Sequence, residues 1–201
     1  MAAIEIDKKQ LKQINQLVGN IKKGAATVIR RGVNRTVGQA KTLTSKEVRT
    51  VVNLKKKTVD EHLKVTKANF KSLSAKLTIS GRPISLVLYG ARRTNAGVNV
   101  KVRKSKAIEK HKSSFIATMK SGHRGVYVRT TKPGGRKKPG KASDYNISKS
   151  GRVNRLHIDE KYGPSIPAVF QFNNEKKVSK ISADNLQKNI DREILYLLSK
   201  Q

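Results

Sequence analysis

The sequence predicts an α+β protein in which a long N-terminal helical region is packed on an antiparallel β-sheet, followed by a basic loop and a C-terminal helix. Apolar residues have a helical spacing up to about residue 69, alternate with polar residues after it, and regain a helical spacing near the C-terminus. We therefore divide one structural domain into four segments: a helical region at 1–69, a sheet core at 70–129, a basic loop at 130–156 and a last segment at 157–201.

The helical spacing is clearest in residues 8–40. The apolar side chains expected on one helix face begin with Leu11, Ile14, Val18, Ile21, Ala25 and Val28. Four glycines interrupt the segment, namely Gly19, Gly24, Gly32 and Gly38. Each costs about 1 kcal/mol of helix stability relative to Ala. We expect these glycines either to break the helix or to allow another helix to approach closely.

Two stretches with the spacing of a helix N-terminal capping box follow, at residues 44–47 and 58–61. Apolar residues come after each of them, including Leu63 and Val65 after the second. This pattern predicts two short helices, or one long helix with a break near residues 53–57.

Alternating apolar residues predict strands at residues 73–79, 84–88 and 98–102, separated by turns that contain glycine. The stretch "SSFIATMKSGHRGVYVR", residues 113–129, predicts two further strands joined by a turn with His123 and Arg124 at its tip. We expect one antiparallel sheet of about four or five strands, with the helices packed on one side.

The segment 130–156 differs in composition from the rest of the chain. It holds eight Lys and Arg against one Asp, together with two Pro and four Gly. This composition predicts a long basic loop that is mobile in the isolated protein. Beyond it, a stripe from Leu186 to Leu198 predicts a C-terminal helix over residues 181–198, with Ser182 as the N-cap.

The charge of the chain indicates an anionic partner. Lys and Arg number 45 against 13 Asp and Glu, which gives a formal net charge of +32. Such an excess suits nucleic acid, an acidic protein surface, or both. The chain has no cysteine, which excludes disulfides and thiolate metal sites. Because no long apolar run or signal-peptide core is present, we expect a soluble protein that is not exported by the usual route and has no membrane partner.

Residues 135–142 come close to a phosphate-binding P-loop, but Ala142 stands where that motif needs a hydroxyl group for Mg²⁺. The sequence that follows is a poor helix, so a solvated basic loop is the better interpretation. Ser121 and His123 form no recognisable nucleophile–base motif, and no Gly-x-Ser-x-Gly elbow is present.

The histidines do not have the spacing of metal ligands to one another; they are His62, His111, His123 and His157. A surface charge group explains His157, Asp159 and Glu160 better than a metal site does. We therefore expect no enzyme activity, no catalytic residue, no cofactor or metal site, and no small-molecule substrate.

Nucleic-acid binding explains the charge better than an enzymatic function does. However, aromatic residues are only 4% of the chain, and none lies in a recognisable RNA-binding strand motif. This favours contact with a phosphate backbone or an acidic surface over base readout. The candidate contacts with DNA or a protein partner are Arg92, Arg93, Lys101, Arg103, Lys104, His123, Arg124, Arg136, Lys137 and Lys138.

Five phrases in a fixed order resemble a known family. They are "GVNRTV" at 32–37, "LTISGRPISLVLYGAR" at 77–92, "GVNVKVRK" at 97–104, "SFIATMKSGHRGVYVR" at 114–129 and "YGPSIPAVF" at 162–170. The chain resembles the bacteriophage minor tail protein Z family, the tail-completion proteins of lambda-like phages, over about residues 20–175. It departs from the family pattern in its longer basic loop and in the lysine-rich region at 44–57.

The resemblance implies a structural virion protein that acts at the head-proximal end of the tail, where tail and head join and the genome passes. It implies a homo-oligomeric ring, with six copies expected, and neighbours among the terminator, head-closure or connector rings. Viral DNA in the channel would be a further partner. The protein would be found in the virion tail or neck, and in the host cytoplasm during assembly. A free-standing basic nucleic-acid-binding protein remains the alternative, and a nucleotide-dependent enzyme using residues 135–142 is the less favoured one.

Overall fold

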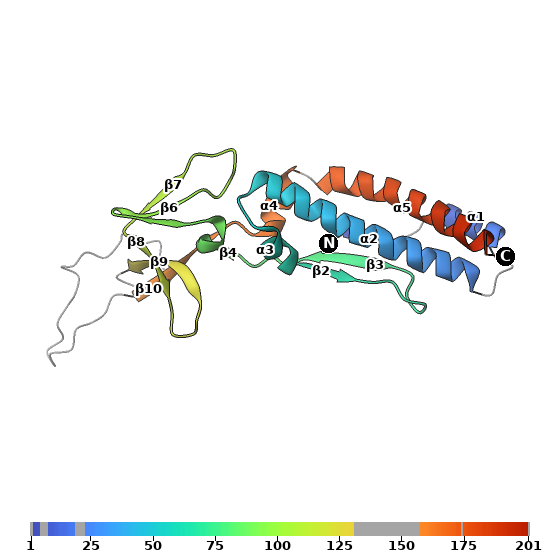
Figure 1. Cartoon of the computed structure of the whole chain (residues 1–201), viewed down its shortest axis with the longest axis horizontal. Coiled ribbons are helices and arrows are strands. Elements are labelled where there is room, and N and C mark those ends of the chain that lie inside the picture. Colours follow the sequence, from blue (N-terminus) through green and yellow to red (C-terminus); the bar gives the residue numbers. More distant parts are fainter. Residues whose placement is uncertain (1, 5–7, 19–22, 131–156, 174, 201) are drawn as a thin grey trace. The chain divides into compact units, whose positions relative to one another are not determined.

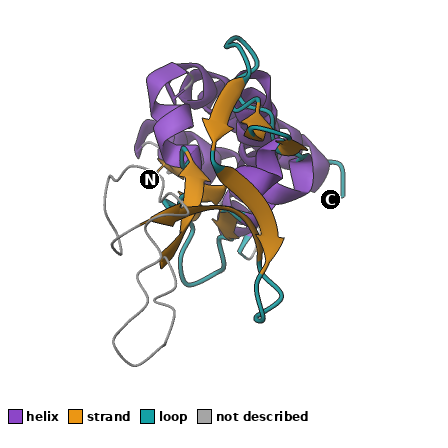
Figure 2. Cartoon of the chain, turned by 90° about the vertical axis from the view of Figure 1, so that its left-hand side faces the viewer, coloured by secondary structure: helices purple, strands orange, loops and turns teal. Residues whose placement is uncertain are grey.

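The computed structural model describes residues 2–4, 8–18, 23–130, 157–173 and 175–200 (Figure 1). Helices and antiparallel strands are both present, which confirms the predicted α+β class (Figure 2). The chain divides into two compact units. Unit 1 comprises Met1–Arg49, Lys56–Gly81 and Ile166–Gln201, and unit 2 comprises Thr50–Lys55 and Arg82–Ser165. The ends of the chain therefore belong to the same unit, and most of unit 2 is inserted between them.

The described residues of unit 1 form five helices and one small sheet. The helices are α1 (Lys8–Val18), α2 (Gly24–Val51, of which the last two residues belong to unit 2), α3 (Lys56–Glu61), α4 (Ile166–Asn173) and α5 (Glu175–Leu198). The strands are β1 (Ala2–Ile4), β2 (Leu63–Thr66) and β3 (Ala75–Ile79), and their order in the sheet is β1-β3-β2.

The apolar stripe of α2 forms much of the core of unit 1. Val28, Val33 and Val37 are fully buried, and α5 runs beside α2 (Figure 1). The predicted helix at 8–40 is thus confirmed over Lys8–Val18 and from Gly24 onward, while Gly19 and Ile21 fall outside the described residues. A helix start at Gly24 agrees with the expected break.

Gly32 packs directly against Ile190 of α5. A Cβ atom on Gly32 would lie 3.1 Å from Cγ1 of Ile190, whereas one on Gly38 would meet nothing within 4 Å. The expectation that glycine admits a neighbouring helix is confirmed at Gly32 and is wrong for Gly38, which is exposed.

A buried polar contact fixes the register of α2 against α5. The Asn189 side-chain amide donates to the Thr36 hydroxyl at 2.9 Å and to the Gln39 side-chain carbonyl at 2.9 Å. The Thr36 hydroxyl in turn donates to the Gly32 carbonyl at 2.8 Å. Buried polar groups need such partners, because an unpaired one costs about 1–3 kcal/mol.

The capping-box predictions were wrong in detail. Thr44 and Ser45 lie inside α2 and are buried, because Thr44 continues the stripe from Ala40 to Val48 at four-residue spacing. Packing therefore outweighs the local capping signal. The predicted break is confirmed, since α2 ends at Val51 and α3 begins at Lys56.

Two further helix boundaries also differ from the predictions. Leu63 and Val65 are in strand β2, where they pair with Ile79 and Leu77, so their two-residue alternation describes them better than a helical spacing. Ser182 is buried inside α5 and is not its N-cap, since that helix begins at Glu175.

The strands of unit 2 form two antiparallel sheets with orders β4-β10-β9-β8 and β5-β6-β7. They are β4 (Ile84–Ser85), β5 (Arg92–Thr94), β6 (Gly97–Val100), β7 (Glu109–Lys112), β8 (Ser114–Thr118), β9 (Arg124–Thr130) and β10 (His157–Gly163). The prediction of a single sheet is therefore wrong. Ser113, with φ of 57°, turns the chain between β7 and β8, so that consecutive strands enter different sheets.

The strand predicted at 84–88 is also shorter than expected. After β4 the chain forms a 3₁₀ helix, η1 (Leu86–Tyr89), which ends at Gly90 with φ of 80°. Leu86 and Tyr89 are buried while Leu88 is exposed, a three-residue spacing that suits a 3₁₀ helix.

Tyr89 is the largest fully buried side chain of unit 2. Its hydroxyl donates to the Pro164 carbonyl at 2.7 Å, and burial raises its pKa far above the usual range, so the phenol keeps its proton. Gly163 provides the space for the ring, because a Cβ there would lie 2.6 Å from it. The Asn53 side-chain amide donates to the Tyr89 carbonyl at 3.0 Å.

Candidate anion-binding surface

The predicted contact residues that the structure describes all belong to unit 2. Arg92 and Arg93 lie on β5, and Lys101, Arg103 and Lys104 follow β6. His123 ends the turn before β9, and Arg124 is the first residue of β9. Arg136, Lys137 and Lys138 lie outside the described residues. Of the loop predicted at 130–156, only Thr130 is described, and it is the buried last residue of β9.

Strand register places part of this set on one face of the β5-β6-β7 sheet. Arg92 pairs with Asn99, which pairs with Lys110, and side chains of directly paired residues share a face. Gly97 lies on the same face and pairs with Lys112. Lys101 continues this alternation just beyond β6, where it is exposed between two buried valines.

We call the set formed by Arg92, Lys101, Lys110 and Lys112 the basic face. All four side chains are exposed, and within the described part of the chain none of them makes a hydrogen bond or an ion pair. Sequence analysis missed Lys110 and Lys112, because β7 has no alternation of apolar residues. The alternating Lys-His-Lys of residues 110–112 was the only available signal.

The opposite face of this sheet is its buried side. Val98 and Val100 are buried there, paired with His111 and Glu109 respectively. Burial lowers the pKa of His111, and the nearby Lys161 charge lowers it further against the opposing effect of Glu109. Arg93 pairs with Val98, so this predicted contact lies on the other side of the sheet from Arg92.

The carboxylates of unit 2 are occupied by histidines and hydroxyl groups. Within its described residues, the acidic side chains are those of Glu109, Asp159 and Glu160. Glu109 lies 3.7 Å from His111 Nε2, and Asp159 accepts a hydrogen bond from the Thr130 hydroxyl at 2.9 Å. These pairings leave the basic face for an anion from outside the unit.

A turn joins β8 and β9 as predicted, but it ends earlier than expected, since Arg124 of β9 already pairs with Thr118 of β8, and its histidine points back to the sheet. The Met119 amide donates to the His123 carbonyl at 2.9 Å, and Gly122 has φ of 80°. His123 Nε2 lies 2.9 Å from both carboxylate oxygens of Glu160 on β10. The pairing holds the turn against β10, whereas the neighbouring Arg124 is exposed.

Glu160 is the centre of this cluster, since the Tyr162 hydroxyl also donates to it at 2.7 Å. Gly125 leaves room for the carboxylate, because a Cβ there would lie 2.6 Å from Oε1. Burial alone would raise the pKa of Glu160, but the hydrogen bonds from His123 and Tyr162 outweigh it, and the pKa lies below its ordinary value. The negative charge of Glu160 is thus favoured by its surroundings.

Replacing Glu160 by Gln should make the unfolding free energy of the protein less dependent on pH in the acidic range. Because the pKa of Glu160 is lowered in the folded state, its contribution is present above its unfolded pKa and is lost as the pH falls through the folded value. The difference in unfolding free energy between parent and Glu160→Gln should therefore shrink between about pH 5 and pH 3. Urea unfolding at a series of pH values measures it, and a difference that stays constant or grows would contradict the assignment.

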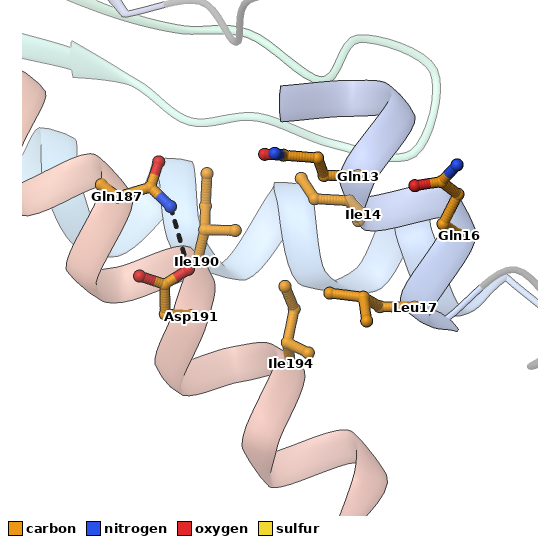
Figure 3. A pocket seen from close by; sticks show the side chains of 8 residues that line it. All are labelled: Gln13, Ile14, Gln16, Leu17, Gln187, Ile190, Asp191 and Ile194. Atoms are coloured by element: carbon orange, nitrogen blue, oxygen red, sulfur yellow. Dashed lines mark hydrogen bonds between the residues drawn. The ribbon is translucent and has the colours of Figure 1, made fainter. Parts of the chain in front are cut away.

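Unit 1 carries a small cleft between α1 and α5, with a volume of about 240 Å³ (Figure 3). Ile14, Leu17 and Ile194 supply apolar side chains, and Gln187 donates to Asp191 at 3.0 Å along its rim. Its mixed lining contains no pair of groups arranged for catalysis. Within the described ranges there is also no group of His, Asp and Glu that could hold a metal ion, and each helix is too short or too polar to cross a membrane.

A comparison with known protein families matches most of the chain. The family described as prophage minor tail protein Z (GPZ) matches the chain over residues 8–200. The match thus extends over both units, including α1 and α5. No curated protein and no solved structure matches the chain significantly.

Proposed function

The chain belongs to the prophage minor tail protein Z family, and on this basis we propose that it is a structural subunit at the head-proximal end of a phage tail, where it completes the tail and joins it to the head. The observation that carries the proposal is the family match over residues 8–200, since a minor tail protein is a component of the virion. Membership of the family assigns the chain to the phage tail, and we propose its position at the head-proximal end of that tail.

The chemistry of unit 2 supports a structural role over an enzymatic one. His123 lies two residues after Ser121 in the sequence. Its ring is paired with Glu160, so it is not positioned as a base for the Ser121 hydroxyl. Ala142 removes the hydroxyl that a P-loop would need. We therefore propose that the protein has no catalytic activity and takes no cofactor.

The partners follow from the same proposal. Tail proteins of the neighbouring rings, namely terminator, head-closure or connector proteins, would contact the subunit, and copies of the chain would form a ring with six members expected. DNA that passes through the ring would meet its positive charge. During assembly the protein would be in the host cytoplasm, and afterwards in the virion.

A free-standing nucleic-acid-binding protein is the second candidate. The observation that favours it is the exposure of the basic face without any carboxylate partner among the described residues. Such a protein would act without entering the particle, and this difference makes the two candidates separable.

Phage made without this protein should accumulate filled heads and separate tails, and adding the purified chain to the mixed lysate should restore infectious particles. Mass spectrometry of tails isolated from purified wild-type particles should detect the chain. Absence from mature particles, together with normal joining in its absence, would refute the proposed position and leave the free-standing candidate.

A further inference from the structure

We infer that the basic face of the β5-β6-β7 sheet binds the phosphate backbone of duplex DNA without reading its sequence. The contact residues are Arg92, Lys101, Lys110 and Lys112, brought together by strand register. The setting of this contact, a DNA path through the tail, rests on the proposed function, whereas the surface itself is defined by the register of described strands.

The spacing of the cations suits a phosphate strand. Lys110 and Lys112 are two residues apart on one strand, which separates their Cα atoms by about 6.8 Å. Arg92 lies two strands away from Lys110, which adds about 9.6 Å in the perpendicular direction. Duplex DNA carries one charge per about 1.7 Å of axis, so a surface of these dimensions faces several phosphates at once.

The composition of the face favours DNA over an acidic protein. The side chains that register places beside the four cations are those of Thr94 and Asn99, and Gly97 has none. Protein interfaces have an apolar core enriched in aromatic residues and depleted of Lys. Apart from the exposed Ile108, which continues the alternation just before β7 opposite Lys101, the side chains of this face are polar and mainly cationic, which is the composition of a surface for phosphates.

The same composition favours duplex over single-stranded nucleic acid. Proteins that bind single strands stack bases on aromatic side chains, and these three strands contain no Phe, Tyr or Trp. Asn99 can add an uncharged hydrogen bond to a phosphate oxygen, which positions the backbone but carries no sequence information.

The structure provides a matched control for the four cations. The test variant replaces Arg92, Lys101, Lys110 and Lys112 by Ala. The control variant replaces Lys55, Arg82, Lys106 and Lys120 by Ala. Each variant removes one Arg and three Lys, all exposed and all in unit 2, so the loss of net charge is the same. Exposed charges contribute little to folding, and thermal unfolding of the full-length variants checks that both remain folded.

Binding of the full chain to a fluorescent duplex of mixed sequence is measured over a range of salt concentrations. Each lost phosphate contact should reduce the slope of log K against log salt by about 0.9, so the test variant should lose about 3–4 and the control less than about 1. Two unrelated duplexes should give the same affinities with the parent chain. Equal slopes for the two variants, or a strong preference for one duplex sequence, would overturn the inference.

An acidic protein partner would give a different result. In that case the test variant would bind duplex DNA like the parent but would bind poly-glutamate more weakly than the control variant does, and the assignment to DNA would be wrong. Joining of heads to tails is measured separately with both variants. If the slope of the test variant falls as expected while the protein is absent from particles, the inference holds and the proposed function fails. If the protein is present in particles while the slopes of the two variants are equal, the proposed function holds and the inference fails.

Discussion

Replacing Gly32 by Leu should lower the unfolding free energy of unit 1 by about 2–3 kcal/mol, because overpacking a tight contact costs that much. Even a Cβ atom at this position would lie 3.1 Å from Cγ1 of Ile190, and three further carbon atoms have to be placed between α2 and α5. The side chain would push the helices apart and stretch the hydrogen bonds that Asn189 makes to Thr36 and Gln39. Denaturant unfolding followed by circular dichroism measures the loss.

The matched control is the same substitution six residues later in the same helix. Gly38 is exposed, and a Cβ there would meet nothing within 4 Å, so Gly38→Leu should raise stability by about 0.5–1 kcal/mol through helix propensity alone. Opposite signs at the two positions would establish Gly32 as the site of helix contact. Two losses of similar size would show that α2 and α5 are not packed through Gly32.

Replacing Tyr89 by Ala should destabilise unit 2 by about 3–5 kcal/mol, which is the usual cost of removing a fully buried aromatic side chain. The change leaves a cavity beside Gly163 and also leaves the Pro164 carbonyl without its donor. Tyr89→Phe keeps the ring and removes only the hydrogen bond, so it should cost about 1 kcal/mol.

Leu88 provides the control in the neighbouring position of η1. It is 46% exposed, so Leu88→Ala should cost less than about 1 kcal/mol. Hydrogen exchange of the β9 and β10 amides, which lie in unit 2, reports on all three variants. A loss at Leu88 as large as that at Tyr89 would contradict the assigned burial.

The sequence correctly predicted the elements whose apolar periodicity matches their burial. It failed where contacts between residues far apart in the sequence determine the secondary structure. The stripes of α2 and α5 and the alternation of β3 and β6 all appear where expected. Thr44 and Ser45 were wrongly predicted as a helix start because a capping box is a local signal, whereas the continuation of α2 depends on the burial of Thr44. Leu63 and Val65 similarly became a strand because β3 provides pairing partners for them.

The candidate surface was predictable only in part for the same reason. Lys101 could be placed from the alternation of Val98, Val100 and Val102, which are all buried. Lys110 and Lys112 belong to a strand without an apolar pattern, which among the described strands pairs with β6 alone. The pairing of His123 with Glu160 joins residues 37 positions apart, and no local pattern predicts which carboxylate a turn histidine will meet.

The insertion of unit 2 between the parts of unit 1 determines the order in which a nascent chain can be completed. Asn189 and Thr36 are 153 residues apart, so α2 leaves the ribosome long before its partner α5 is translated. At a translation rate of about 5–20 residues per second, α5 is synthesised on the order of ten seconds after α2. During this time the apolar stripe of α2 has no α5 to pack against, while unit 2 is synthesised and can fold. Helix α2 is therefore synthesised early but reaches its final packing late. During that interval the α2 stripe lacks its own α5, so the α5 of a completed copy can pack there instead, which is a route by which two copies of the chain can exchange helices.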